Sequence, residues 1–299
     1  MKYGHIARWF YSEPWAILPA KLLAMSEALE FLAAGGEYTA EEIAQIVGAA
    51  RPAIRTGNAI AVLPLHGVLS HRAGMLSEAS GGTSTERFGA AFRQMLSDPS
   101  VGSILLDVDS PGGSVSGVDE LSAEIFRARG QKPIVAQVNA TAASAAYWIA
   151  TAADEVVVTP SGEVGSIGVF AAHQDESAKQ ERDGVRTTLV SAGRYKIEGN
   201  PYEPLSEEAR AALQERVNDY YGMFVAAVAR NRGVSVSDVR EGFGQGRMVG
   251  ARQAKAENMA DRIDTYEATL ERLAGGHYRR LQRAALASAR LRLAEQALR

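Results

Sequence analysis

Apolar positions change their spacing along the chain, and these changes divide it into three parts. Between Pro14 and Phe31 they recur at helical spacing, and Thr39 precedes two glutamates in the manner of a helix cap. From residue 58 to 273, short apolar runs alternate with amphipathic stretches. The pattern predicts an N-terminal helical region with a linker from Arg51 to Asn58 (1–57), a central domain (58–273) and a helical tail (274–299).

The central domain alternates between two periodicities. Short apolar runs bounded by glycine or proline are typical of strands, which we expect at 60–65, 101–108, 133–138, 155–159 and 166–170. Helical spacing predicts helices at 84–96, 115–129, 142–152, 206–232 and 250–258. Strands that alternate with helices favour a parallel sheet with crossover helices, so the predicted fold class is α/β.

The composition is that of an ordinary globular protein, and it excludes several kinds of chemistry. The 299 residues are 46% hydrophobic and carry a net charge of −3, so we expect no nucleic-acid partner. The sequence has 0 cysteines, which excludes disulfides, thiolate metal sites and cysteine nucleophiles. Without a signal peptide or a run of about 18 apolar residues, the chain is expected to be cytoplasmic and to have no membrane anchor.

Ser144 is the first candidate for catalysis. It lies among alanines at a predicted strand-to-helix junction, where small neighbours leave room for a substrate backbone. The amide of Ala145, at the start of the helix, can face a developing oxyanion. A serine attacks only when a base takes its proton. The alternative is a small-residue helix that packs closely on the sheet and has no catalytic role.

A Pro-Gly-Gly turn, residues 111–113, follows a predicted strand upstream of this serine. Glycine permits positive φ and close backbone approach, so an amide of this turn can aim at an oxyanion. The alternative is a strand-to-helix turn that binds no ligand.

Two residues compete for the role of base. Lys196 is flanked by Tyr195 and Ile197, whose side chains suit an apolar site. A lysine accepts a proton only when it is neutral, and its pKa falls far enough only when it is removed from solvent. His173, with Asp175 close by, offers a Ser-His-Asp triad with Ser144 instead. The sequence has no metal motif, P-loop or dinucleotide fingerprint, so we expect no metal and no cofactor.

Five ordered segments resemble the bacterial signal peptide peptidase A family. They are LLDVDSPGGSV (105–115), AASAAY (142–147), GSIGV (165–169), SAGRYK (191–196) and GRMVGARQA (246–254). Within that family the chain is most similar to tailed-phage head-maturation serine proteases, which share the segments 13–15 and 196–202 and a histidine near His173. The resemblance implies a Clp/crotonase-like spiral of strands and a homo-oligomeric ring in which Lys196 acts in trans.

The resemblance also implies an activity, a serine endopeptidase that works through a Ser-Lys dyad. Its implied residues are the nucleophile Ser144, the base Lys196, the oxyanion donors Gly113 and Ala145, and the substrate-binding residues Gly112, Ser166 and Ile167. The expected substrates are proteins or peptides, among them capsid or scaffold proteins, met in the host cytoplasm or the procapsid.

Two features depart from the family pattern. The alanines after Ser144 stand where many relatives have glycine, which narrows the site. The tail from Tyr278 to Arg299 has six arginines against Glu295, so it could bind a capsid or scaffold protein or could cap the oligomer. Three alternatives stay open: a housekeeping protease that degrades signal peptides, a catalytically silent ring-forming protein, and an acyl-CoA enzyme of the same fold.

Overall fold

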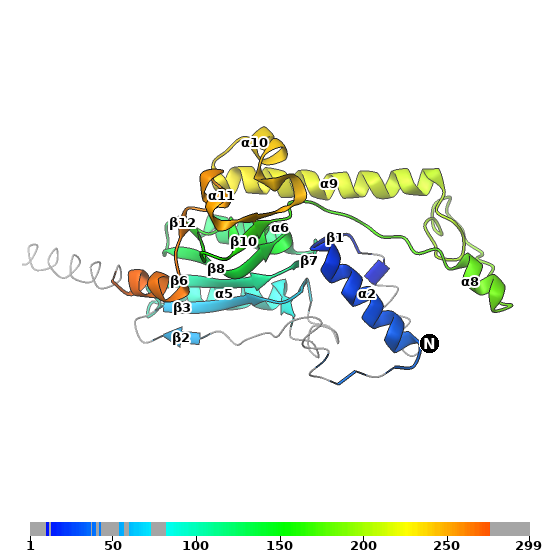
Figure 1. Cartoon of the computed structure of the whole chain (residues 1–299), viewed down its shortest axis with the longest axis horizontal. Coiled ribbons are helices and arrows are strands. Elements are labelled where there is room, and N and C mark those ends of the chain that lie inside the picture. Colours follow the sequence, from blue (N-terminus) through cyan, green and yellow to red (C-terminus); the bar gives the residue numbers. More distant parts are fainter. Residues whose placement is uncertain are drawn as a thin grey trace, which may run out of the picture.

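The structure is a computed structural model that describes residues 10–39 except 12 and 37, residue 42, and residues 54–56, 60–72 and 82–275. Three parallel strands form the centre of an eight-stranded sheet: β3 (Ile60–His66), β6 (Ser103–Ser110) and β8 (Ile134–Ala143). Continuous apolar runs build these strands, because both faces of the sheet are covered. Figure 1 shows the sheet between the helices.

The sheet divides into two branches along β8, and this division determines where residue 144 lies. The first half of β8 pairs with β9 (Glu155–Val158), whereas its last three residues pair with β10 (Glu163–Gly165). The strands β11 (Met248–Gly250) and β12 (Arg262–Ile263) extend the two branches. Residue 144, which follows β8 directly, therefore emerges next to the end of β10.

A second, four-stranded sheet continues from β6 after one residue. Its order is β1 (Trp15–Ile17), β7 (Gly112–Ser114), β4 (Leu69–Ser70) and β5 (Thr83–Ser84). β1 runs antiparallel to β7, almost 100 residues away in the sequence. This small sheet carries the Pro-Gly-Gly turn of the sequence.

Four helices cover one face of the large sheet and form the main core with it. They are α5 (Thr85–Ser97), α6 (Val118–Arg127), α7 (Ala145–Ala150) and the long α9 (Glu207–Arg232). Trp148 of α7 stacks on Phe224 of α9, with ring centroids 4.5 Å apart. On the other face, helical residues 266–275 place Leu273 against strand residues such as Ile60 and Val157.

The remaining elements are short or lie at the edges. They are α2 (Pro19–Ala33), β2 (Ile54–Thr56), α8 (Ser177–Arg182), α10 (Val236–Glu241), a 3-10 turn (Phe243–Gly246) and α11 (Ala251–Ala256). Figure 1 shows the first half of α9 projecting beyond the sheet toward α8.

The predicted α/β class is confirmed, together with most of its elements. The strands expected at 60–65, 101–108 and 155–159 and the helices expected at 84–96, 115–129 and 206–232 are present within a few residues. Ser84 and Ser206 cap α5 and α9 through hydroxyls that accept backbone N–H groups. The capping box at Thr39 also forms, with reciprocal hydrogen bonds to Glu42.

Four predictions about elements were wrong. Residues 15–17 form a strand rather than the start of a helix, which begins only at Pro19. Residues 54–56 form β2 instead of a linker, and β8 extends to Ala143, so α7 starts later than expected. Residues 166–170 form one isolated bridge at Phe170 rather than a strand. The strand at 15–17 and the extension of β8 depend on backbone pairing with distant segments, and local periodicity does not record such pairing.

Two parts of the sequence interpretation lie outside the described residues. The tail from Tyr278 to Arg299 is one, and most of the segment from Arg51 to Asn58 is the other. The two boundaries between the three predicted parts stay predictions.

Candidate active site

Ser144 is the N-cap of α7, and its backbone is strained. Its φ of 54° and ψ of −117° form a combination that residues with side chains rarely adopt. Such strain persists only where the surrounding structure enforces it, and it is common at functional sites. Here β8 and the fully buried α7 enforce it. α/β-Hydrolases also place a serine on a sharp, strained strand-to-helix turn.

The contacts of Ser144 hold it against the segment that follows β10. Its amide donates to the carbonyl oxygen of Gly165 at 2.7 Å, and its Oγ donates to that of Gly168 at 3.3 Å. The residue is 1% exposed. In the part of the chain that the structure describes, this hydroxyl therefore meets a carbonyl oxygen rather than a side-chain base.

Gly112 and Gly113 lie beside Ser144 at positions where no side chain fits. Gly112 has a φ of +95°, and a Cβ there would lie 2.9 Å from the carbonyl oxygen of Ala143. A Cβ on Gly113 would lie 2.0 Å from the carbonyl oxygen of Leu69. Close approach of neighbouring backbone therefore accounts for both glycines.

Ser166 and Ile167 lie beyond β10, on the other side of β8 from the glycines. Ser166 has a φ of 53°, and its amide donates to the carbonyl oxygen of Arg247 at 2.9 Å. Ile167 is 4% exposed, and its side chain packs in the main core. The backbone from Gly168 to Phe170 thus forms one wall beside Ser144, and β7 forms the other.

Tyr147 and Arg129 stabilise the helix behind the serine. The Tyr147 hydroxyl donates to the carbonyl oxygen of Met259 at 2.9 Å, and complete burial raises the pKa of this phenol. Arg129 donates to the carbonyl oxygens of Thr151 and Ala152 at the end of α7, at 2.7 and 2.9 Å. The Tyr147 hydroxyl is thus committed to the Met259 carbonyl.

Lys196 lies in a projecting arm, residues 174–205, which contains α8. None of these residues is buried in the single chain, and Lys196 itself is exposed. The arm is tied to α9 by Glu208, which accepts hydrogen bonds from Arg194 and Tyr195. Figure 1 shows α8 far from β8, beyond the projecting end of α9. In the part of the chain that the structure describes, Lys196 is exposed and no hydrogen bond joins it to Ser144.

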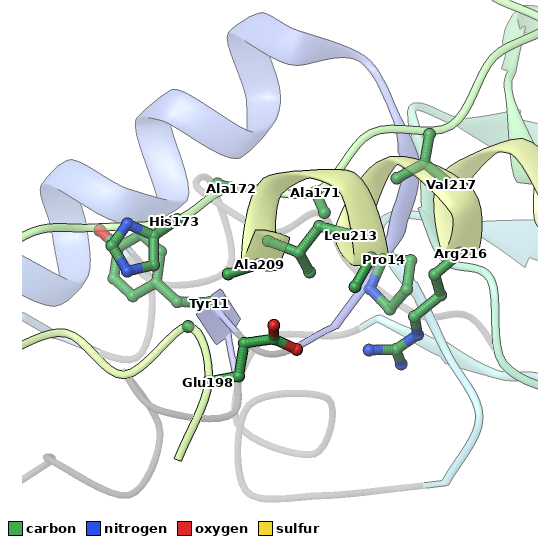
Figure 2. Close-up of a pocket in the computed structure, with 12 residues that line it drawn as sticks. Tyr11, Pro14, Ala171, Ala172, His173, Glu198, Ala209, Leu213, Arg216 and Val217 are labelled. Carbon is green, nitrogen blue, oxygen red and sulfur yellow. The ribbon is translucent and has the colours of Figure 1, made fainter. Parts of the chain in front are cut away.

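His173 also lies away from the serine. Its Nε2 is 3.1 Å from the carbonyl oxygen of Asn200, at one end of a pocket of about 300 Å³. Figure 2 shows His173 beside Tyr11 and places Arg216 at the opposite end. Asp175 instead accepts the backbone N–H of Ser177 at 2.9 Å. This geometry gives no support to a triad of Ser144, His173 and Asp175.

Sequence reasoning missed a buried polar group at the carboxyl ends of β3 and β6. His66 Nε2 lies 3.2 Å from Asp107 Oδ2 but is poorly aligned for a hydrogen bond, and Asn139 donates to the other carboxylate oxygen. The available signal was an aspartate within an otherwise apolar strand. Among the described residues, no cluster of His, Asp and Glu could hold a metal ion, and no helix is long and apolar enough to cross a membrane.

Comparison with known proteins decides the family. The model of peptidase family S49 matches residues 127–278, which include Ser144, the arm and α9. The chain belongs to peptidase family S49. This family contains the signal peptide peptidases that the sequence motifs resemble, so the predicted relationship is confirmed.

Two phage proteins are among the relatives of this S49 member. The head-tail preconnector protein GP5 of Enterobacteria phage P21 is 38% identical over 74% of this chain and 44% of its own length. The capsid assembly protease C of Escherichia phage lambda is 34% identical over 85% of this chain and 58% of its own length. The chain thus spans about half the length of these relatives.

A solved structure of a membrane-bound stomatin-specific protease is also similar. It has a TM-score of 0.44 and 12% identity, and the match covers 71% of this chain and 83% of that one. This likeness adds nothing to the α/β architecture described above.

Proposed function

We propose that this protein is a serine endopeptidase in which Ser144 of one subunit works with Lys196 of a neighbouring subunit. The observation that carries the proposal is the strained, buried backbone of Ser144 beside two glycines that tolerate no side chain. Membership of family S49 supports the reaction class. The names of the phage relatives support capsid-associated proteins as substrates.

The proposed reaction begins with proton transfer. Neutral Lys196 accepts the proton of Ser144 as Oγ bonds to the scissile carbonyl carbon, and the carbonyl oxygen becomes an oxyanion. The amides of Gly113 and Ala145 stabilise that charge. The lysine then protonates the leaving amine as the C–N bond breaks. Water attacks the resulting acyl-enzyme and restores the serine.

Exposure of the arm supports catalysis in trans. A lysine serves as a base only when burial disfavours its charged form. In a single chain Lys196 is exposed to solvent, and burial has to come from another surface. Docking of the arm against the neighbouring subunit of a ring would supply that surface, with Gly112, Ser166 and Ile167 left to contact the substrate.

Mixing two inactive variants tests the proposal. Ser144→Ala and Lys196→Ala are each expected to lose nearly all casein and peptide cleavage. Their mixture should recover about one quarter of wild-type activity, because each active site needs one intact residue from each of two neighbours. Arg194→Ala is the matched control from the arm, and it keeps its activity alone.

Two results would contradict this arrangement. Full activity of Lys196→Ala would remove the lysine from the mechanism, and loss of activity in His173→Ala would favour a histidine base. If the mixture assembles normally, as judged by light scattering, but recovers no cleavage activity, Lys196 does not act on the Ser144 of a neighbouring subunit.

A further inference from the structure

The space between the two walls beside Ser144 contains a strand of the chain itself. β1 pairs with β7 on one side, with Trp15 opposite Ser114 and Ile17 opposite Gly112. On its other side, Trp15 and Phe170 exchange two backbone hydrogen bonds of 2.8 and 3.0 Å. β1 thus bridges both walls, as an extended peptide does when it adds to the edges of a sheet.

The register of β1 directs the carbonyl group of Ala16 at the amide of Gly113, the proposed oxyanion donor. Backbone hydrogen bonds join Val115 to Pro14 and Leu18 to Pro111, so alternation along the ladder makes Ala16 and Gly113 the hydrogen-bonding pair between them. The carbonyl oxygen of Ala16 lies only 2.2 Å from where a Cβ of Gly112 would be. The carbonyl oxygen of Ala143, next to Ser144, lies 2.9 Å from that same point.

β1 belongs to a unit that packs separately from the main core. Trp15 and Ile17 form their own apolar cluster with residues of α2, among them Leu22 and Met25. The Trp15 indole N–H donates to the carbonyl oxygen of Phe10 within the same unit. Of the three β1 residues, Ala16 alone packs in the main core. The strand and α2 can therefore move together without opening the large sheet.

We infer that residues 14–18 are an internal peptide that occupies the substrate cleft and has to leave before a substrate binds. The inference rests on the proposed function, because it takes the walls beside Ser144 as the substrate site. It also defines a substrate class: an extended peptide with a small residue opposite Gly113 and large apolar residues on either side of it, as in Trp15-Ala16-Ile17.

The pocket of Figure 2 continues the cleft beyond β1. Pro14 and Ala171 line it at the end of the strand, and Arg216 and Glu198 supply its charged side chains. A peptide in the place of β1 would therefore extend past Pro14 into a partly polar cavity.

A reversible covalent lock tests the inference. Ser116 Oγ donates to Glu13 Oε2 at 3.3 Å, so these side chains face each other two residues beyond the last pair of the strands, Trp15 and Ser114. Because the chain has 0 cysteines, Glu13→Cys with Ser116→Cys introduces a single thiol pair. Oxidation should lower peptide cleavage at least tenfold, and reduction should restore it. The two single-cysteine variants are the controls and should not respond to oxidation.

Binding separates this inference from the proposed function. In a Ser144→Ala background, a labelled synthetic peptide of residues 13–20 should bind at least tenfold more weakly to the oxidised lock than to the reduced form. Such a difference upholds the inference even if the wild type cleaves nothing. Equal cleavage and equal binding in both redox forms would overturn it, whatever the activity of the wild type.

Hydrogen exchange covers the case in which the disulfide does not form. Adding the same peptide to Ser144→Ala should release the protected amides of Trp15 and Leu18, which belong to the departing strand and donate to Phe170 and Pro111. If those amides keep their protection while the peptide binds, the strand does not leave and the inference is wrong. Cleavage of the chain itself at Ala16, absent in Ser144→Ala, would also overturn it, because β1 would then be a substrate.

Discussion

The body around Ser144 and the arm that carries Lys196 differ in almost every physical respect. Ser144 is 1% exposed and sits where the strands β6, β8 and β10 end together. The arm has no buried residue, and its Val190 is 94% exposed. The fold of one chain thus fixes the proposed nucleophile in place and leaves the proposed base exposed to solvent. This difference is why we place the base of each site on a neighbouring subunit.

A pair of glycines gives the largest expected contrast. Gly113→Ala puts a Cβ against the Leu69 backbone, so we expect a loss of about 4 kcal/mol in the free energy of unfolding. Gly184→Ala in the arm meets nothing within 4 Å and costs about 1 kcal/mol for its positive φ. Urea denaturation measures both. Similar losses would mean that the arm is packed as tightly as the body.

Two ion pairs, one in the body and one that joins the arm to α9, should differ next most in their contribution to stability. Asp261 accepts two hydrogen bonds from Arg232, at 2.7 and 2.8 Å, and one from the Val156 amide. We expect Asp261→Asn to cost about 2–3 kcal/mol, because it leaves a buried guanidinium unpaired. Where the arm meets α9, Glu208→Gln removes the exposed pair with Arg194 and should cost less than about 0.5 kcal/mol. Chemical denaturation again provides the comparison.

The pH dependence sharpens this second contrast. Burial raises the pKa of Asp261, but the hydrogen bonds and charge of Arg232 outweigh it and hold the pKa below its ordinary value. The stabilisation by Asp261 is therefore complete above the unfolded pKa of about 3.9, and it is lost as the pH falls through the folded value. The stability difference between wild type and Asp261→Asn should shrink below about pH 4. A difference that grew instead would contradict the lowered pKa.

Backbone strain at Ser144, the proposed nucleophile, is expected to give a smaller change in stability of opposite sign. Glycine adopts the backbone angles of Ser144 without penalty, so Ser144→Gly should raise the free energy of unfolding by about 1 kcal/mol. Ser144→Ala keeps the Cβ and serves as the control, with little change. Thermal unfolding of the two variants measures the difference. Equal melting temperatures would mean that the strain costs nothing.

The smallest effect on stability is expected at the base. Lys196→Ala should change the free energy of unfolding by less than about 0.5 kcal/mol, since its side chain is exposed in the single chain. The same variant should lose nearly all cleavage activity. A scan of denaturation at several protein concentrations checks both subunit stability and assembly. A large loss of stability at low concentration would show that Lys196 supports its own subunit.

Local patterns predicted the helices and strands whose apolar spacing matches their burial. α5 and α9 followed from capped, periodic segments, and β3 and β9 from short apolar runs. Motif order and the family resemblance also assigned Ser144 and the Pro-Gly-Gly turn to one site. The same patterns failed at Trp15, where an apolar run before a helix turned out to be a strand. Its partner lies about 100 residues away, and periodicity within a short window contains no information about it.

The sequence by itself determined the α/β class, the family resemblance and the residue types for nucleophilic catalysis, because these depend on local spacing and on short motifs. Only the tertiary structure decided that Ser144 adopts a left-handed backbone, that β1 lies between its two walls, and that Lys196 stands apart. These three features arise where distant segments meet. Packing and backbone pairing between such segments set their conformation, and local propensity is too weak to do so.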